Sequence, residues 1–595
     1  MRAASLANRL RRLWHGRAVQ VVHHPAYRLP LPALETRLKL EPRRADFALW
    51  YLLTSGALSP RSVRRPQRIS YEDLARVHTP DLLDALSRPE ALAAVYSVDP
   101  AEVRVDELLD AVRLACGGTL QSARFCLAAA KTRATSRPGA CALNLLGGFH
   151  HAGPGRAGGF CPVNDIAVAV ASLRKDGFAG RIAVLDFDAH PPDGTAECLR
   201  RDAAVFIGSI SGVSFGALEG VDETVLPPGT GDDAYLEALD ALLARMPTAQ
   251  LAFVIAGGDV LRGDALGQLG LSLDGARRRD LRVSAALGST PSVWLPGGGY
   301  ADDAWRALAG TGLALSINTR TPVPGGFDPL RSRYRFIART LATEQLGLGA
   351  GISLDDVAED LGLRPRRPGT LLGFYSAGGI EHALDRYGIL AELTSLGYGA
   401  FRVELSAGDD VGDRLRVFGS VGRAEYLLIE TVLERRIIDG APVLYVHWLT
   451  LRNPAARFTA QRPRLPGQEV PGLGLAHEAA ELFARMAERL GLEGVAFRPA
   501  NFHNAYAGRT VLRFVEAGRQ GRFEALLRDL AGTPPAALTQ ALAEGRVQMN
   551  DAPYVWEAEE MVRWRASHPV DAAAVASERE RVHFSLLPLA PEPAA

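Results

Sequence analysis

The sequence predicts an α/β domain built on parallel strands, followed by a second domain of the α+β class. Between residues 19 and 318, short apolar runs alternate with stretches of helical periodicity, as in repeated β/α units. A Pro/Gly-rich stretch at residues 321–329 marks a domain boundary. Beyond it, apolar runs follow one another without intervening helices, which is typical of antiparallel strands.

Three apolar runs of the first domain are predicted to be buried parallel strands. They cover residues 181–186, 251–256 and 292–296, and a polar, Gly-rich loop follows each of them. Helical periodicity is clear at residues 165–173 and 234–243. Because ligands of open α/β sheets bind beyond the carboxyl ends of the strands, the three loops are expected to converge.

The predicted organisation has five parts. A basic N-terminal segment (1–18), interpreted as a surface helix, precedes the α/β domain (19–320), and a linker (321–350) leads to the α+β domain (351–585). Residues 586–595 form a Pro/Ala-rich tail. The α+β domain is expected to contain strands at 401–405, 415–418, 426–435 and 443–451 and a helix at 475–490.

Composition narrows the class of protein. With 47% hydrophobic and 23% charged residues, the chain is an ordinary globular protein. Its formal net charge of zero provides no field for nucleic acid, and it has no apolar run of about 18 residues for a membrane span. Five cysteines without CxxC spacing indicate free thiols and a cytoplasmic protein. The preference for Arg over Lys, with much Ala, Gly and Leu, suggests a bacterial source.

The end of the strand at 181–186 carries a candidate metal site. Alternation along the strand end points Asp186, Asp188 and His190 to one side, so that two of them can bind a metal while the third orients a neighbour. Asp and His together suit zinc or another borderline divalent ion. Asp259, after the next strand, is the expected third ligand, and three protein ligands leave a position for water. The alternative is an acidic strand end that only caps a helix or forms a solvated turn.

Proton-transfer groups are expected nearby. His150 and His151 are adjacent after a Gly-Gly turn and are candidates for general base and general acid. Asp186 and Asp193 are available to hold their far nitrogens. The alternative is a buried, hydrogen-bonded histidine pair. Tyr300 follows a triple glycine, where its hydroxyl can donate to an oxyanion.

These motifs resemble those of a known family. Residues 147–152 (GGFHHA), 158–167 (GGFCPVNDIA), 186–190 (DFDAH), 258–264 (GDVLRGD) and 297–300 (GGGY) occur in the order seen in the arginase/deacetylase fold. Over residues 19–318 the chain resembles the zinc-dependent histone deacetylases, above all class IV, and the bacterial acetoin-utilisation and acetylpolyamine amidohydrolase proteins.

The resemblance implies a zinc-dependent deacylase that hydrolyses the amide of N-acyl-lysine, an acylpolyamine or another small N-acyl amine. It implies zinc at Asp188, His190 and Asp259, and a structural potassium ion near Asp186, Asp188 and the Ser209 loop. It pairs His150 with Asp186 and His151 with Asp193, and it gives Tyr300 the role of polarising the scissile carbonyl. Gly159, Phe160 and Phe215 would line the acyl-lysine channel.

Two departures from the family pattern concern the same site. Pro191 and Pro192 stand between the ligand histidine and Asp193, and because proline fixes φ, they put the His151–Asp193 pair in question. Ser211 stands where relatives commonly have histidine, which could alter the rim of the pocket. A rival interpretation is an acyl-amine binding protein without turnover; it would be expected to lack a metal ligand or Tyr300, and neither is lost.

The second domain carries weaker signals. Gly472 and Gly474 precede the helix at 475–490 and resemble, with a spacing one residue too long, the GNAT acetyltransferase turn that binds coenzyme A. This implies a bifunctional protein with a C-terminal acyltransferase. An interaction or substrate-recruiting module is the alternative. Residues 498–506, polar and aromatic, are interpreted either as lining a site or as an ordinary helix start.

Overall fold

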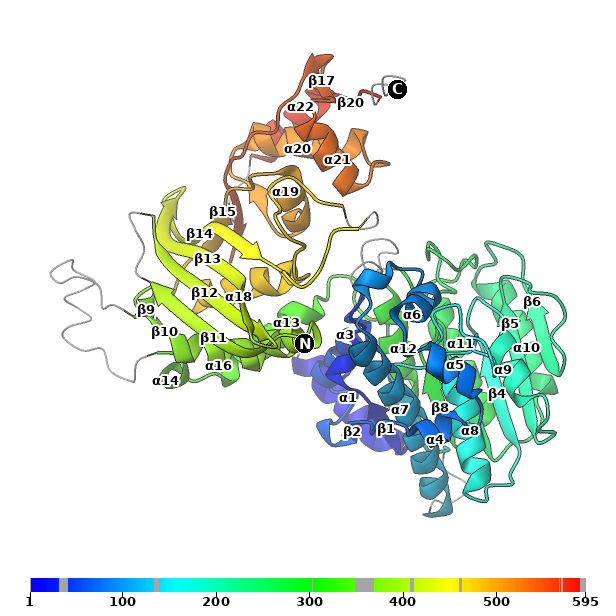
Figure 1. Ribbon diagram of the computed structural model, residues 1–595. Coiled ribbons are helices and arrows are strands. Elements are labelled where there is room, and N and C mark those ends of the chain that lie inside the picture. Colours follow the sequence, from blue (N-terminus) through cyan, green and yellow to red (C-terminus); the bar gives the residue numbers. More distant parts are fainter. Residues whose placement is uncertain are drawn as a thin grey trace. The chain divides into compact units, whose positions relative to one another are not determined.

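The computed structural model shown in Figure 1 describes residues 2–31, 41–132, 138–301, 303–347, 369–406, 411–459, 463–566, 568 and 571–588. The end of the predicted linker (348–350), the start of the predicted α+β domain (351–368) and residues 589–595 of the tail lie outside these ranges. The chain divides into two units, Met1–Ser332 and Arg333–Ala595.

The first unit is built on an eight-stranded sheet in which every pair of neighbours is parallel. Its order is β2-β1-β3-β8-β7-β4-β5-β6. The predicted parallel strands are confirmed as β4, β7 and β8, and all their residues are buried, as expected of strands covered on both faces. The strands are β1 (Val19–Val22), β2 (Val63–Arg64), β3 (Cys141–Asn144), β4 (Ile182–Asp186), β5 (Val205–Ser211), β6 (Val221–Val225), β7 (Leu251–Ile255) and β8 (Ser292–Leu295).

Helices flank this sheet, because a parallel strand can only be followed by another through a crossover connection. α7 packs with α8, and α11 packs with α10 and α12 (Figure 1). The predicted helices at 165–173 and 234–243 are α8 and α10. The helices are α1 (Arg2–His15), α3 (Arg44–Thr54), α4 (Tyr71–Leu74), α5 (Pro80–Ala85), α6 (Pro89–Tyr96), α7 (Val105–Thr132), α8 (Asp165–Lys175), α9 (Asp193–Leu199), α10 (Asp232–Arg245), α11 (Leu273–Leu287) and α12 (Ala304–Ile317).

The second unit is of the α+β class, as predicted. A seven-stranded sheet has the order β11-β12-β13-β14-β15-β19-β16, in which β11 to β14 are antiparallel and β14 runs parallel to β15. The four predicted strands correspond to β11–β14, and the predicted helix is α18. The main strands are β11 (Gly399–Ser406), β12 (Asp413–Val421), β13 (Ala424–Ile438), β14 (Ala441–Leu451), β15 (Gly494–Phe497), β16 (Arg513–Phe514) and β19 (Met561–Trp564).

Helices and two small sheets complete this unit. Residues predicted as linker include helices, and Ile337, Leu341 and Leu346 pack into the core of the second unit. The helices are α13 (Pro329–Thr340), α14 (Thr343–Leu346), α16 (Ala377–Tyr387), α17 (Ile389–Ser395), α18 (Ala476–Arg489), α19 (Phe502–Gly508), α20 (Ala517–Asp529), α21 (Pro535–Ala543) and α22 (Ala572–Arg581). The remaining strands are β9 (Thr370–Leu371), β10 (Tyr375–Ser376), β17 (Val547–Met549), β18 (Ala552–Pro553) and β20 (Phe584–Leu586).

The remaining expectations about the fold can be compared with these elements. Residues 2–15 of the basic N-terminal segment form α1, and among the described residues no helix is long and apolar enough to cross a membrane. Within the segment 498–506, Phe502 opens α19 and packs in an apolar core with Phe514 and Phe523, so this part of the segment is a helix start. All five cysteines are free thiols.

Candidate active site

The site lies beyond the carboxyl ends of β4, β7 and β8, which are neighbours in the sheet. The loops that follow them converge as predicted, because backbone amides of two of these loops donate to carboxylates of a neighbouring loop. The amide of Gly298 donates to Oδ2 of Asp188 at 2.6 Å, and the amide of Ala189 donates to Oδ1 of Asp259 at 3.0 Å. The two acids therefore lie on adjacent strand ends with fixed orientations.

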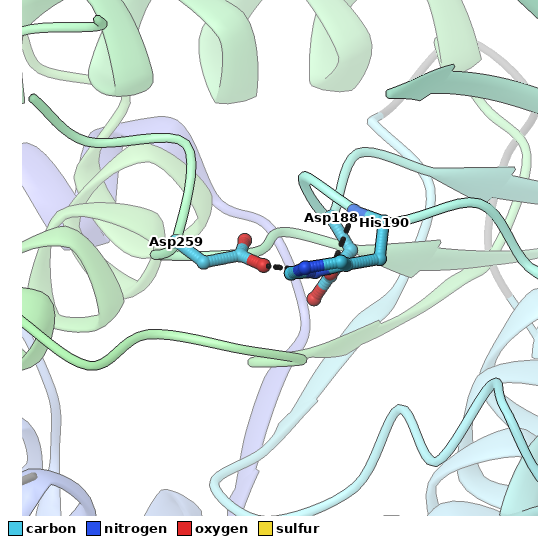
Figure 2. Close-up of side chains that lie close together, drawn as sticks. All are labelled: Asp188, His190 and Asp259. Carbon is cyan, nitrogen blue, oxygen red and sulfur yellow. Dashed lines mark hydrogen bonds and ion pairs between the residues drawn. The ribbon is translucent and has the colours of Figure 1, made fainter. Parts of the chain in front are cut away.

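Asp188, His190 and Asp259 form a cluster with the geometry of a metal site (Figure 2). Nδ1 of His190 lies 3.2 Å from Oδ1 of Asp188 and 3.1 Å from Oδ2 of Asp259. One ligand atom from each residue lies within 4.8 Å of the others. Four-coordinate zinc with ligand bonds of about 2.0–2.2 Å separates its ligand atoms by comparable distances.

The electrostatics of this cluster also fit a divalent cation. Both carboxylates are fully buried, and burial together with the neighbouring Asp188 carboxylate raises the pKa of Asp259. Burying two carboxylates beside one imidazole costs free energy unless a cation compensates their charge, since burial of an unpaired charge is strongly unfavourable. A bound zinc ion would compensate both carboxylates, so the donor set fits the group that the sequence predicts.

His150 pairs with Asp186, as the sequence predicts. Nδ1 of His150 lies 2.9 Å from Oδ2 of Asp186, and its Nε2 lies 3.7 Å from Oδ1 of Asp188. Burial, the strongest single influence, lowers its pKa. The carboxylates of Asp186 and Asp188 outweigh burial and raise the pKa of His150 to about 9. The imidazole is therefore held in one orientation, with Nε2 toward the metal cluster.

His151 pairs with Asp193 despite the two intervening prolines. Nδ1 of His151 lies 2.7 Å from Oδ1 of Asp193, and Nη2 of Arg156 lies 2.8 Å from the other carboxylate oxygen. Burial and then the nearby His150 lower the pKa of His151, although Asp193 opposes them. The two histidine rings, with centroids 4.1 Å apart, thus differ in proton affinity.

Steric constraints explain why the two residues before Phe149 and these histidines are glycines. Gly147 and Gly148 have φ values of 145° and 82°, in the region that disfavours side chains. A Cβ on Gly147 would lie 2.6 Å from Oδ2 of Asp165. The Asp165 carboxylate accepts hydrogen bonds from the amides of Gly148 and Phe149 and from the hydroxyl of Thr119. This buried acid, which our sequence interpretation assigned no role, therefore shapes the turn that presents His150.

Tyr300 lines the same cavity as the histidines and the metal cluster. This cavity has a volume of about 260 Å³. Burial, followed by the carboxylates of Asp188 and Asp259, raises the pKa of Tyr300 well above its ordinary value, so the phenol keeps its proton. Its amide donates to Oδ2 of Asp264 at 2.6 Å. Asp264 also accepts from the amides of Leu266 and Gly267, so this carboxylate holds its own loop against Tyr300.

The predicted channel residues border this cavity. The Phe160 ring centroid lies 5.5 Å from that of Tyr300, and the Phe215 centroid lies 5.9 Å from that of His151. Phe215 is 50% exposed, so it stands where the cavity meets solvent. Gly159 also lines the cavity, and a Cβ there would lie 2.3 Å from Cδ2 of His151. Glycine at this position leaves room for the imidazole.

Two arginines, the part-buried Arg44 and the fully buried Arg279, support the site, and our sequence interpretation missed both. Arg44 donates to the carbonyls of Gly297 and Gly299, which lie in the Gly-rich loop before Tyr300. Arg279 donates to the carbonyls of Phe187 and Gly257, which flank the two metal-cluster acids. Both arginines come from helices remote in sequence, so no local pattern marked them.

Four further residues named in the sequence analysis are located as follows. Ser211 is buried and donates to Oε1 of Glu223 at 2.8 Å; it is not among the described residues that line the cavity. The hydroxyl of Ser209 is buried and bonds to no described residue, and the potassium ion predicted beside it stays a prediction. In the second unit, Gly474 (φ 76°) directly precedes Leu475, the N-cap of α18, while Gly472 forms a bridge with Arg452.

Comparison with known proteins agrees with this geometry. A family model described as the histone deacetylase domain matches residues 39–314. An uncharacterised protein of Picosynechococcus is 35% identical over 294 residues, which cover 47% of this chain and 92% of that protein. Histone deacetylase 2 of Arabidopsis thaliana is 31% identical over 314 residues, covering 49% of this chain and 77% of that protein.

The chain therefore belongs to the histone deacetylase family. The residues matched by the family model, 39–314, lie within the first unit. Among solved structures, a histone deacetylase homologue from Aquifex aeolicus is similar, with 24% identity, a TM-score of 0.41, and coverage of 52% of this chain and 86% of that one.

Proposed function

We propose that the first unit is a zinc-dependent deacylase that hydrolyses the amide bond of N-acyl-lysine or a related N-acyl amine. The observation that carries the proposal is the convergence, in one cavity, of the Asp188–His190–Asp259 cluster with two histidine–aspartate pairs. Three ligands from the protein leave a coordination position open, which distinguishes catalytic from structural zinc sites.

A zinc ion held by this cluster would supply Lewis acidity, which acidifies water and polarises an amide carbonyl. The chain's own residues would then move the protons. His150 and His151 face the same cavity and are held by Asp186 and Asp193, so one can accept a proton from water while the other protonates the departing amine. An amine is too basic to leave without that proton.

Tyr300 would stabilise the charge that develops on the carbonyl oxygen. Its phenol stays protonated and borders the same cavity, so it can donate a hydrogen bond to an oxyanion. Phe160 and Phe215 would enclose the aliphatic part of the substrate, as aromatic walls exclude water from a narrow channel. Acylated protein lysine, an acylpolyamine and a small acylated amine all fit this chemistry, and we propose a cytoplasmic location.

The test uses the purified full chain. Zinc content would be measured, and release of carboxylate would be followed from acetyl-lysine peptides and acetylated polyamines, with acyl chains of increasing length. We expect hydrolysis that requires zinc and is lost in His150→Ala, whereas the exposed His583 provides a matched His→Ala control. If the zinc-loaded chain binds acyl amines but hydrolyses none, the rival interpretation as a binding protein replaces this proposal.

A second candidate function concerns the second unit. β14 pairs with β15 only from Val443 to Val446 and then continues to Leu451, which leaves the end of β14 without β15 as a neighbour. The glycine turn and the N-terminus of α18 follow in the chain, and a helix N-terminus favours anionic groups. These features support binding of coenzyme A by an acyltransferase. Titration of the full chain with coenzyme A tests this, and absence of saturable binding would contradict it.

A further inference from the structure

The second unit contains a cavity of about 100 Å³ within its apolar core. It lies among α16, α18 and the strands β12 to β14, and its walls are mostly aliphatic and aromatic. An engineered cavity of about 150 Å³ with such walls stays dry and binds small apolar molecules. Apolar walls of this kind suit a hydrocarbon chain. Its apolar lining includes Ile380, Leu384, Leu415, Ile429, Leu482 and Phe483.

One charged side chain in this lining lacks sufficient partners. Arg485 is only 5% exposed, and its Nε and Nη1 are buried and bond to none of the described residues. Nη2 alone faces carboxylates, at 3.0 Å from Glu488 and 3.6 Å from Glu481. Leaving buried charged donors unpaired is costly, so a guanidinium in this position needs an additional acceptor.

Other hydrogen-bond donors line the cavity. Tyr375, Tyr387 and Arg489 belong to its lining together with Arg485. Burial raises the pKa of Tyr387 to about 12, while the positive charges of Arg489 and Arg485 oppose that rise. The cavity thus combines apolar walls with a cluster of cationic and phenolic donors, an arrangement that matches an amphiphilic anion.

We propose that this cavity binds a medium-chain carboxylate, with the hydrocarbon chain among the apolar walls and the carboxylate bound by Arg485. The carboxylate would supply the acceptor that Nε and Nη1 lack, in the paired geometry that guanidinium groups favour. The proposal concerns the second unit alone and does not depend on hydrolysis in the first.

The test is calorimetric titration of the full chain with sodium octanoate, beside a series from butanoate to dodecanoate. We expect saturable binding, with affinity rising about fourfold per added methylene until the cavity is full. Octan-1-ol should bind at least tenfold more weakly than octanoate, because it cannot form a charge-assisted pair with Arg485.

Two variants test separately the Arg485 charge and the space for the hydrocarbon chain of the ligand. Arg485→Met should weaken octanoate binding about tenfold or more, whereas Arg335→Met is the matched control, since Arg335 reaches Glu488 at 3.6 Å but does not line the cavity. Ala383→Leu fills part of the cavity with apolar volume while keeping the Arg485 charge, and should likewise weaken octanoate binding. Equal binding by Arg485→Met and the unaltered chain would overturn the proposal, as would an unaltered chain that binds no octanoate.

Discussion

Nδ1 of His151 lies 2.7 Å from Oδ1 of Asp193, although two prolines separate Asp193 from the metal-cluster residue His190. The prolines do not disturb the pair because they end where α9 begins, with Pro192 at its N-cap and Asp193 as its first residue. The amide of Thr195 donates to the carbonyl of His150, which fixes the start of α9 against the two histidines.

The first prediction tests this pair. Asp193→Asn should lower kcat about 10- to 100-fold while KM changes little. The neutral amide of asparagine cannot hold His151 in one protonation state and orientation as the Asp193 carboxylate does. Steady-state hydrolysis of an acyl-lysine peptide measures both constants. Glu197→Gln, which alters another partner of Arg156, should leave kcat near that of the unaltered chain. An unchanged kcat in Asp193→Asn would mean that the pair only supports the fold.

The second prediction concerns the oxyanion donor. Tyr300→Phe should lower kcat about 100- to 1000-fold, since one hydrogen bond to the developing charge is lost while the ring stays in place. Zinc content, measured by mass spectrometry, should not change. Tyr71→Phe removes an exposed hydroxyl and serves as the control. A near-normal rate in Tyr300→Phe would exclude this role.

The third prediction concerns the metal. Removal of zinc by a chelator should abolish hydrolysis and lower the thermal midpoint of unfolding, because the buried carboxylates of Asp188 and Asp259 then lack a cation. Added zinc should restore both. Asp259→Asn should fail to retain stoichiometric zinc after gel filtration, while Asp222→Asn, remote from the site, should retain it. Full activity in the chelator-treated chain would contradict a metal-dependent reaction.

The fourth prediction is a pH dependence of stability in the first unit. Burial lowers the pKa of His78 from 6.5 to about 4, and its ring contacts the carbonyl of Gly153 and the amide of Asn164. The imidazole of His78 binds a proton more readily in the unfolded chain than in the folded one. The contribution of neutral His78 to the stability of the fold is therefore complete above pH 6.5. It is lost as pH falls toward 4, and amounts to about 3 kcal/mol.

Amide hydrogen exchange in β4 measures this effect, because it reports on the opening of the first unit. Between pH 7 and pH 4.5, the free energy of opening should fall more in the unaltered chain than in His78→Gln, because glutamine at position 78 does not titrate. Identical pH dependences in the two proteins would show that His78 does not contribute.

Much of the first unit could be predicted from sequence because its signals are local. The apolar runs of β4, β7 and β8 are continuous, and Asp186, Asp188 and His190 take alternate positions from the last residue of β4 onward. The supporting groups carry no such signal. Arg44, Arg279 and Asp165 reach the site from helices, and in sequence an arginine or aspartate on a helix is typical of a solvated surface.

The sequence by itself determined the fold class, the family and the candidate ligands, since each depends on residue types at short, regular spacings. Only the tertiary structure decided whether Asp193 reaches His151 across Pro191 and Pro192, because that depends on where α9 begins and what it packs against. It alone also revealed the buried guanidinium of Arg485 beside an apolar cavity, since the cavity exists only between packed helices and strands.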